Sequence, residues 1–252
     1  MQILLTNDDG IFAPGIVALE HELRQIADVC VVAPAMEQSG VGHSITFLTP
    51  LTAKEVFQGS ARRGWAVDGS PADSVKLGLF EFCPRRPDLV VSGINGGLNA
   101  GINILYSGTV AAAIEGAFFG LNSVAVSLEY DEQADYARAA KIARDLIVAI
   151  LERKSAKPQL YNINIPTAAI RGPAEVRCVP MGIAQYGEQY EKRIDPRGRP
   201  YYWAVGGPLE KSAEETDLTA LKAGFVTLTP LDFDLTKRRV LAEMEQWKFG
   251  QL

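Results

Sequence analysis

The stretch LLTNDDGIFAPG, residues 4–15, passes from an apolar run into two adjacent acids and then into a proline and a glycine. The apolar run QILLT is short and uninterrupted, which is typical of a strand buried in a parallel sheet. A helix is predicted to begin near Pro14, because proline is favoured in the first helical turn. The residues that then share one apolar stripe are Ile16, Leu19, Leu23 and Ile26. A strand, a polar loop and an amphipathic helix in this order predict a βα unit.

The same alternation continues through the first two thirds of the chain. Short apolar runs recur at residues 29–34, 88–93, 123–128 and 161–166. Helical periodicity separates them, at 110–121 and again at 134–151. One face of the second helix carries Tyr136, Ala140, Ala143, Ile147 and Leu151. The pattern predicts an α/β fold with a doubly wound, mainly parallel, Rossmann-like sheet.

The sequence changes character after residue 170. We therefore predict a Rossmann-like catalytic core over 1–170 and an appendage over 171–252. Residues 176–208 contain two β segments around the polar tip DPRGRP, which predicts an extended β-hairpin arm. A lone hairpin buries too little apolar surface to be stable, so the arm is expected to pack on a partner subunit. A returning segment then leads to a C-terminal helix over 233–249, docked outside the core.

Composition restricts the partners. Of the 252 residues, 47% are hydrophobic and 22% are charged, as in an ordinary globular protein. A net charge of −5 disfavours binding to polymeric nucleic acid. No apolar stretch reaches membrane-spanning length and MQILL lacks the basic start of a signal peptide, so we expect no membrane partner and a cytoplasmic location. The three cysteines are odd in number and far apart, which suggests neither a disulfide framework nor a zinc site.

Polar loops follow three of the predicted strands: TNDDG, AMEQSGVGHS and SGINGGLNAG. Ligands of open parallel sheets bind beyond the carboxyl ends of the strands, where the strand order reverses. If these strands are neighbours, the residues that meet there are Asp8, Asp9, Ser39 and Asn95. Their oxygens are hard ligands, which suit Mg²⁺, Mn²⁺ or Ca²⁺ better than zinc or copper. A cation, or hydrogen bonds from loop amides, would offset the repulsion between the two acids.

A possible anion site precedes the helix in LYSGTVAAAIEG. There, loop amides and a helix N-terminus at Ser107, Gly108 and Thr109 can hold a phosphate oxygen. A metal that faces such an anion site is the layout of a phosphoryl-transfer enzyme.

Plainer interpretations remain open for each residue. NDDG is a common turn, and the hydroxyls, amides and acids above are also common helix caps and loop residues. His43 is as compatible with a structural hydrogen bond as with the site. Ser70 and Asp73 are interpreted first as capping residues and second as part of the site wall. The dinucleotide GxGxxG, the P-loop GxxxxGK[ST] and the GxSxG elbow are all missing from the sequence.

Seven segments in order, spanning nearly the whole chain, resemble the SurE family of stationary-phase survival protein nucleotidases. They are ILLTNDDGIFAPG, VVAPAMEQSGVGHSIT, AVDGSPADSVKLGL, PDLVVSGINGGLNAG, YSGTVAAAIEGAFFG, NINIP and TDLTALKAGFVTLTP. The resemblance implies a metal-dependent, acid-type 5′-nucleotidase that acts on nucleoside 5′-monophosphates, and on 3′-monophosphates and short polyphosphate in some members. The family's metal ligands fall on Asp8, Asp9, Ser39 and Asn95. Its phosphate-side residues fall on Gly40, Asn99, Ser107, Gly108 and Thr109.

The resemblance also implies a cofactor and an assembly. The cofactor is one divalent ion, Mg²⁺ or Mn²⁺, with Ca²⁺ as a substitute in a crystal. The partners are a nucleoside monophosphate and further copies of the chain, in a homodimer or homotetramer built through the hairpin and an exchanged C-terminal element. One position departs from the family: Phe12 stands where many relatives carry His after NDDGI, so rate or pH dependence is expected to differ.

The resulting hypothesis is hydrolysis by a metal-activated water that attacks phosphorus in line. The catalytic candidates are Asp8, Asp9, Asn99 and Ser107, with Thr109 as a further donor to the developing charge. Either Asp is a candidate to accept the water's proton, and covalent attack by one of them is an alternative. The alternative function is a noncatalytic nucleotide- or phosphate-binding regulator, which would bind its ligand tightly without turnover.

Overall fold

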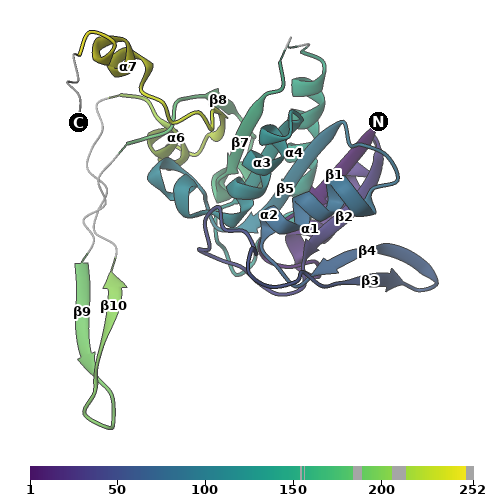
Figure 1. Ribbon diagram of the computed structural model, residues 1–252, viewed down its shortest axis with the longest axis horizontal. Helices are drawn as coiled ribbons and strands as arrows, with labels where there is room; N and C mark the ends of the chain where they lie inside the picture. The colour runs from purple at the N-terminus through teal and green to yellow at the C-terminus, as the bar shows by residue number, and fades with distance from the viewer. Residues whose placement is uncertain (154, 156, 184–188, 206–213, 248–252) are drawn as a thin grey trace.

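The computed structural model describes residues 1–153, 155, 157–183, 189–205 and 214–247. Within these residues the centre is a nine-stranded sheet in the order β3-β4-β2-β1-β5-β6-β7-β11-β8 (Figure 1). Its strands are β1 (Gln2–Thr6), β2 (Asp28–Pro34), β3 (Ala53–Gln58), β4 (Ala61–Val67), β5 (Leu89–Gly96), β6 (Asn122–Leu128), β7 (Leu160–Ile165), β8 (Val176–Cys178) and β11 (Val226–Leu231). Neighbouring strands run parallel except in the pairs β3–β4 and β7–β11. The predicted α/β fold with a mainly parallel sheet is confirmed.

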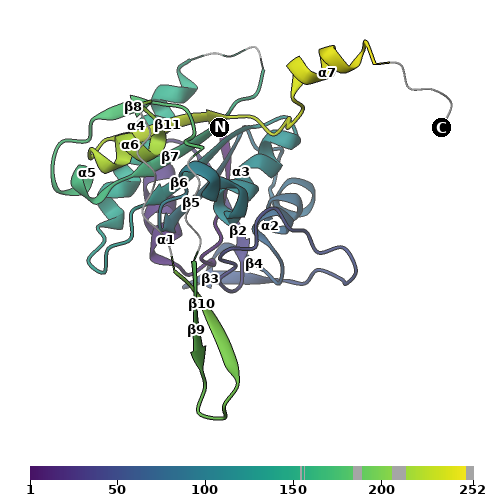
Figure 2. The same cartoon turned by 90° about the vertical axis from the view of Figure 1, so that its left-hand side faces the viewer.

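Helices cover both faces of the sheet (Figure 2). α1 (Pro14–Leu23) and α4 (Tyr136–Leu151) pack on one face, and α2 (Pro71–Leu77) and α3 (Gly108–Phe118) on the other. The remaining helices are the π-helix η1 (Gly78–Phe82), the 3₁₀ helix η2 (Gly101–Tyr106), α5 (Thr167–Arg171), α6 (Asp217–Lys222) and α7 (Arg238–Met244). The helix predicted at Pro14 begins there but ends at Leu23, so Ile26 lies beyond it.

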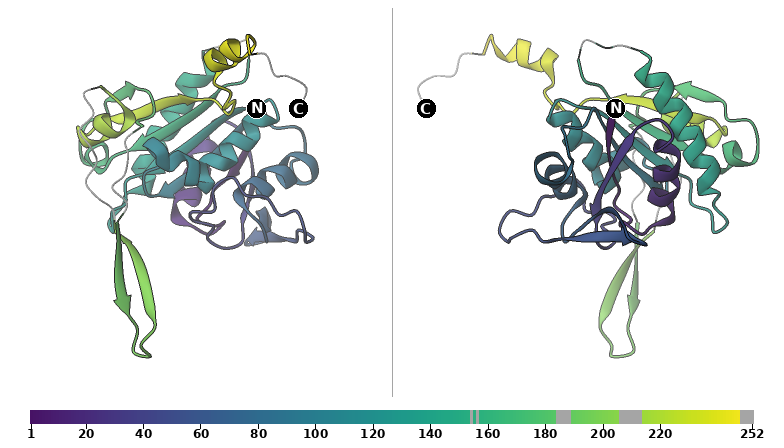
Figure 3. Two further views of the ribbon diagram at one scale, coloured as in Figure 1. Left: turned by 60° about the vertical axis from the view of Figure 1, so that its left-hand side comes forward. Right: turned by 90° about the vertical axis from the view of Figure 1, so that its right-hand side faces the viewer.

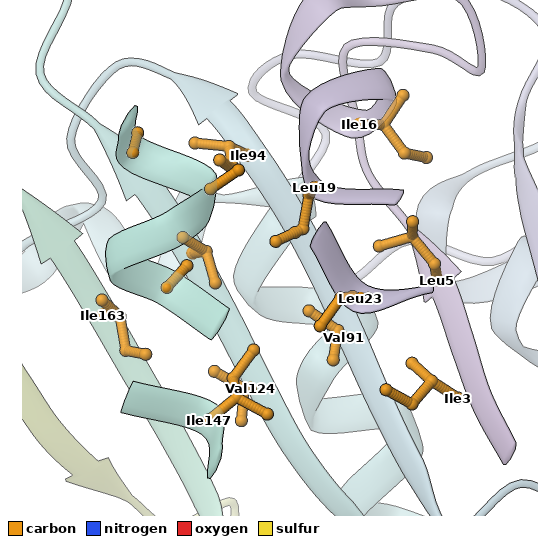
Figure 4. Close-up of a cluster of buried hydrophobic side chains, with 14 of the residues drawn as sticks. Ile3, Leu5, Ile16, Leu19, Leu23, Val91, Ile94, Val124, Ile147 and Ile163 are labelled. Atoms are coloured by element: carbon orange, nitrogen blue, oxygen red, sulfur yellow. The ribbon is translucent and has the colours of Figure 1, made fainter. Parts of the chain in front are cut away.

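Alternate residues of the central strands supply the two faces of the core. On the face covered by α1 and α4, Ile3, Leu5 and Val91 pack with Leu19 of α1 and Ile147 of α4 (Figure 4). The opposite face buries a second cluster: Leu4, Val32, Val67, Val75, Val90, Ala112 and Leu121. Each large apolar side chain contributes about 1.5–3 kcal/mol when fully buried. These clusters therefore fix β1, β2 and β5 side by side at the middle of the sheet.

α1 packs very closely on the sheet at its first turn. A Cβ on Gly15 would lie 2.0 Å from the carbonyl oxygen of Ile94 in β5. Only glycine permits this approach, and it brings the start of α1 against the end of β5.

Two regions differ from the sequence-based expectation. An antiparallel hairpin, β3 and β4, extends one edge of the sheet and was not predicted. The first three residues of the arm predicted over 176–208, Val176–Cys178, instead form β8 and pair with β11 in the main sheet. Residues 184–188 and 206–208 of that prediction lie outside the described residues. The hairpin itself consists of β9 (Gln189–Ile194) and β10 (Pro200–Val205), which project away from the sheet (Figure 3).

Part of the C-terminal helix predicted over 233–249 is present as α7, which covers Arg238–Met244 and has no buried residue. Residues 248 and 249 of that prediction lie outside the described residues. Figure 2 shows α7 outside the layers of the central domain. Among the residues that the structure describes, no helix is both long and apolar enough to cross a membrane.

Candidate functional site

The three loops predicted to converge follow adjacent strands. β1 lies between β2 and β5, with parallel pairing to both. The chain continues from β1 to β2 on one side and from β5 to β6 and β7 on the other, so the strand order reverses at the β1–β5 pair. Asp8 and Asp9 follow β1, Ser39 follows β2, and Asn95 lies at the end of β5. This is the edge at which ligands of open α/β sheets bind.

Asp8 is almost completely buried, with 4% of its surface exposed. Its Oδ2 accepts a hydrogen bond from the backbone N–H of Thr109 at 3.0 Å, and its Oδ1 accepts one from the Thr109 hydroxyl. Thr109 lies in the first turn of α3, where the helix dipole favours a negative charge. Burial nevertheless raises the pKa of Asp8, because the two bonds from Thr109 offset only part of the desolvation.

Gly108 allows the close contact between α3 and the loop after β1. A Cβ at this position would lie 2.9 Å from the Cβ of Asp8 and 3.0 Å from its Oδ2. Ser107 is the N-cap of α3, and its hydroxyl oxygen accepts a hydrogen bond from the N–H of Val110 at 3.1 Å. In this structure, therefore, Ser107 caps the helix and Thr109 holds Asp8, while all three residues lie at the predicted edge of the site.

Asp9 is the more accessible of the two acids. Its Oδ2 accepts a hydrogen bond from the N–H of Gly96 at 3.1 Å, which links the loop after β1 to the end of β5. Burial and the charge of Asp8 raise the pKa of Asp9 to about 6. The same region includes Tyr136, whose pKa is raised by burial and by the charge of Asp9. Tyr136 was predicted only as a packing residue of α4.

The loop that carries Ser39 is tied to Asp8 through the backbone. The N–H of Gln38 donates to the carbonyl oxygen of Asp8 at 2.7 Å. Ser39 is exposed, and its hydroxyl donates to Glu37 Oε1 at 2.6 Å. Gly40 follows with a φ of +71°, a conformation that glycine adopts readily. Glu37 is a third carboxylate whose charge raises the pKa of both Asp8 and Asp9, and sequence reasoning missed it although it stands in the quoted loop.

Asn95 has its side chain oriented by its own loop. Its Nδ2 donates to the carbonyl oxygen of Gly97 at 2.6 Å. The amide oxygen is the ligand atom that Asn95 has to offer to a hard cation.

Asn99 belongs to a buried amide network. Its N–H donates to Asn164 Oδ1 at 2.8 Å, and its Nδ2 donates to Ser127 Oγ at 2.9 Å. Its carbonyl oxygen accepts from Nδ2 of Asn162 at 2.7 Å and from Nδ2 of Asn164 at 3.0 Å. These contacts fix the loop after β5 onto β6 and β7. The sequence motif NINIP contains both asparagines, but only the strand register shows that they reach Asn99.

His43, Ser70 and Asp73, which could be either structural residues or part of the site, have structural roles in the folded chain. His43 Nε2 lies 2.5 Å from Glu115 Oε2 of α3, so it anchors the loop after β2. Ser70 and Asp73 form a capping box at the start of α2. Asp73 also accepts hydrogen bonds from the N–H and hydroxyl of Thr46.

The donor set fits a hard divalent cation. The two desolvated carboxylates repel each other, and a cation between them would remove that cost. Among the described residues, no group of three or more His, Cys, Asp or Glu side chains has metal-binding geometry. A cation would therefore rely on the two acids together with the hydroxyl of Ser39 and the amide oxygen of Asn95, as Mg²⁺ and Mn²⁺ permit.

The chain is similar in sequence and structure to proteins of one family. The family model described as Survival protein SurE matches residues 3–188. The 5′-nucleotidase SurE of Rhodopirellula baltica is 59% identical over 249 residues, which is 98% of either chain. The 5′-nucleotidase SurE of Desulforudis audaxviator is 42% identical, over 98% of this chain and 97% of its own. The crystal structure of the Sure protein from Aquifex aeolicus matches with a TM-score of 0.86 at 39% identity, covering 97% of this chain and 98% of that one.

Proposed function

The chain belongs to the SurE family, and from that premise we propose that it hydrolyses nucleoside 5′-monophosphates with one bound Mg²⁺ or Mn²⁺. Relatives up to 59% identical over nearly the full length are named 5′-nucleotidases, and on that ground this chain is a 5′-nucleotidase. The proposed metal ligands are Asp8, Asp9, Ser39 and Asn95. The observation that carries the metal proposal is the pair of desolvated acids at the strand-order reversal.

A bound divalent cation would supply positive charge for a phosphate oxygen and lower the pKa of a water molecule. The chain's own groups orient the site before any ligand arrives. Thr109 holds Asp8 with two hydrogen bonds, and Gly96 holds Asp9 with one. Preorganised groups of this kind cost little reorganisation during the reaction.

The substrate phosphate is proposed to bind between the acids and the start of α3. The positive end of the α3 dipole faces this edge, and Ser107 retains a hydroxyl proton to donate, since its oxygen accepts from Val110. Gly40, Gly108, Thr109 and Asn99 are proposed to shape the same region. Thr109 holds Asp8, and Asn99 holds the loop after β5 against β6 and β7, so both are first of all positioning residues.

The test is phosphate release by purified protein from 5′-AMP, 5′-GMP, 3′-AMP and tripolyphosphate. Protein stripped with EDTA should release no phosphate, and added Mn²⁺ or Mg²⁺ should restore release from the 5′-monophosphates. Asp9→Asn should abolish the restored activity, whereas Asp145→Asn on the exposed side of α4 should not. Tight nucleotide binding without turnover in any metal would replace this proposal by the regulator alternative. The 3′-nucleotide and polyphosphate rates decide the substrate range.

Direct attack by water and attack by a carboxylate are distinguished by the stereochemistry at phosphorus. With a 5′-nucleotide whose phosphoryl group is chiral at phosphorus, direct in-line attack by water should invert the configuration. Retention, the result of two successive displacements, would show the covalent route through Asp8 or Asp9.

A further inference from the structure

Two of the three cysteines meet in the folded chain although they are far apart in the sequence. Cys30 lies in β2, and Cys83 directly follows η1, where its N–H donates to the carbonyl oxygen of Gly78 at 3.0 Å. Both are half-buried free thiols that pack on the same apolar cluster. Their side chains form a hydrogen bond with each other. Cys178 in β8 is an exposed free thiol and takes no part in this pair.

A cleft of about 510 Å³ gives access to the Cys30 side of this pair. β2 and β4 pair only from Val31 and Gly64 onward, so the cleft opens where the earlier parts of the two strands diverge. Cys30 lines it, and so do the residues on either side of Cys83, Phe82 and Pro84. The Phe82 ring stacks on Trp65 with a centroid distance of 4.1 Å, and the two rings form one side of the cleft.

Charged groups around the cleft are arranged unevenly. The arginines that line it are Arg24, Arg62, Arg63 and Arg85. The acids paired with them are Glu20, Asp28, Glu55 and Asp88. Arg24 and Arg63 share the single carboxylate of Glu20, at 2.8 and 2.7 Å. The cleft as a whole is thus nearly neutral, while positive charge is left over on the side of Arg24 and Arg63.

The two thiols are chemically unequal. The hydrogen bond from the Cys83 thiol lowers the pKa of Cys30, and the charges of Arg62 and Arg24 lower it further. The same hydrogen bond and burial raise the pKa of Cys83. A partly exposed thiolate whose pKa is lowered by nearby arginines is the nucleophile in thiol–disulfide exchange. Cys30 is therefore the attacking thiol, and Cys83 is the neighbour able to resolve its product.

We propose that Cys30 and Cys83 are a redox-active dithiol that closes to an intramolecular disulfide by exchange with a small disulfide such as oxidised glutathione. The Cys30 thiolate attacks one glutathione sulfur, the glutathione S–S bond breaks, and one glutathione thiolate leaves. The Cys83 thiol loses its proton and attacks Cys30, the mixed disulfide breaks, and the second glutathione leaves. The protein gives up two electrons and two protons, and one oxidised glutathione becomes two reduced ones.

The dithiol lies at the opposite end of β2 from the nucleotidase site. β2 runs from Asp28 to Pro34, Cys30 is near its start, and the Ser39 loop follows its end. The disulfide would join β2 to the segment after η1 without touching the carboxylates. The inference therefore stands independently of the proposed function.

The test starts from fully reduced, folded protein incubated with oxidised glutathione. Trypsin separates the cysteines onto three peptides, residues 25–54, 77–85 and 178–192. Under non-reducing conditions, mass spectrometry should find the first two joined, with two hydrogen atoms lost, and reduction should separate them again. Glutathione on Cys178 alone, or the same cross-linking yield from urea-unfolded protein, would overturn the proposal.

Variants assign the order of attack. Cys83→Ser, which keeps a hydroxyl donor, should accumulate glutathione on Cys30, and Cys178→Ser should cross-link at the normal rate. In the Cys83→Ser background, Arg62→Gln should slow the modification of Cys30 severalfold, whereas Arg85→Gln should leave it unchanged. Equal rates in these two arginine variants would contradict the assigned role of the positive charge.

Discussion

Asp8 owes its position to the first turn of α3. Thr109 donates to both carboxylate oxygens of Asp8, one bond from the backbone and one from the hydroxyl. Gly108 provides the space for this contact. Groups that orient a metal ligand in this way are commonly as important as the ligand itself. Thr109 is therefore a positioning residue of the carboxylate pair.

Replacing Thr109 by valine tests this role, because valine keeps the branched shape and the backbone N–H but loses the hydroxyl. The hydroxyl bond lowers the pKa of Asp8, so its loss should raise that pKa. The acid limb of the kcat/KM profile should then move to higher pH, with metal affinity weakened by roughly 10–100-fold. Thr109→Ser should behave like the unmodified protein. Identical pH profiles for the valine and serine variants would show that the hydroxyl has no such role.

Asp9 gives a stability prediction for the metal-free protein. Its pKa is about 6 in the folded chain against 3.8 for an ordinary Asp. The folded state thus binds the proton more tightly than the unfolded state, and the free energy of unfolding falls as pH rises from about 4 to 6. Asp9 is partly exposed, and after allowance for solvent screening the loss should be roughly 1 kcal/mol.

The matching variant is Asp9→Asn, compared with the unmodified protein by urea unfolding in EDTA. The variant should be the more stable protein at pH 7.5, and the difference should vanish near pH 4. Added Mn²⁺ should reverse the order, because a ligand that binds only the folded state stabilises it. An unchanged order in Mn²⁺ would argue against a metal at Asp9.

Sequence reasoning found the acids but not what supports them. The NDDG motif and its place after a strand were enough to single out Asp8 and Asp9. Glu37, Asn162 and Asn164 were missed because their contacts depend on loop conformation and on the register of β6 and β7. The contact between Cys30 and Cys83 was missed because it depends on how the segment after η1 packs against β2.

At the level of elements, the approach of α1 to β5 positions the edge of the site. Gly15→Ala should destabilise the protein by about 1–3 kcal/mol, because a Cβ there would lie 2.0 Å from the Ile94 carbonyl oxygen. Val17→Ala, on the exposed side of the same helix, should change stability by no more than about 0.5 kcal/mol. Urea unfolding measures both. Equal stability of the two variants would mean that the helix shifts without cost.

The elements that the sequence did not predict have weak signals for physical reasons. β3 is an edge strand in which only Val56 is buried, so its apolar alternation is almost absent. β4 begins with two exposed residues and includes Gly64, whose Cβ would lie 2.3 Å from the Val31 carbonyl oxygen. β8 has three residues and pairs with a strand that comes much later in the chain. The buried central strands, by contrast, consist mainly of uninterrupted apolar runs and were predicted correctly.

At the scale of the whole molecule, the projecting hairpin predicts an oligomer. Every residue of β9 and β10 is exposed in the single chain, including Tyr202 and Trp203, whose side chains lie on opposite faces of β10. The protein should be a homodimer or homotetramer by light scattering coupled to size exclusion. Replacing Tyr202 and Trp203 together by serine should reduce the mass of the oligomer. Tyr130→Ser, at an exposed site on the central domain, should not. A monomeric unmodified protein would contradict this prediction.

The order of the strands brings distant parts of the chain to one edge. Alternating strands and helices predicted a doubly wound sheet. The prediction that the loops after β1, β2 and β5 meet depended on these strands being neighbours, which the strand order shows. The division at residue 170 into core and appendage stays a prediction, although α6 and β11 after it pack with the central sheet. The cytoplasmic location also stays a prediction of the sequence.

The most direct test of the account measures metal binding and turnover in the same sample. Metal-free protein is titrated with Mn²⁺, free Mn²⁺ is read by electron paramagnetic resonance, and phosphate release from 5′-AMP is followed at each step. Activity should rise in proportion to one bound Mn²⁺ per chain, and Asp9→Asn should lose both signals together. Full activity before any Mn²⁺ is bound, or tight binding of one Mn²⁺ by Asp9→Asn, would contradict a metal-dependent nucleotidase at these carboxylates.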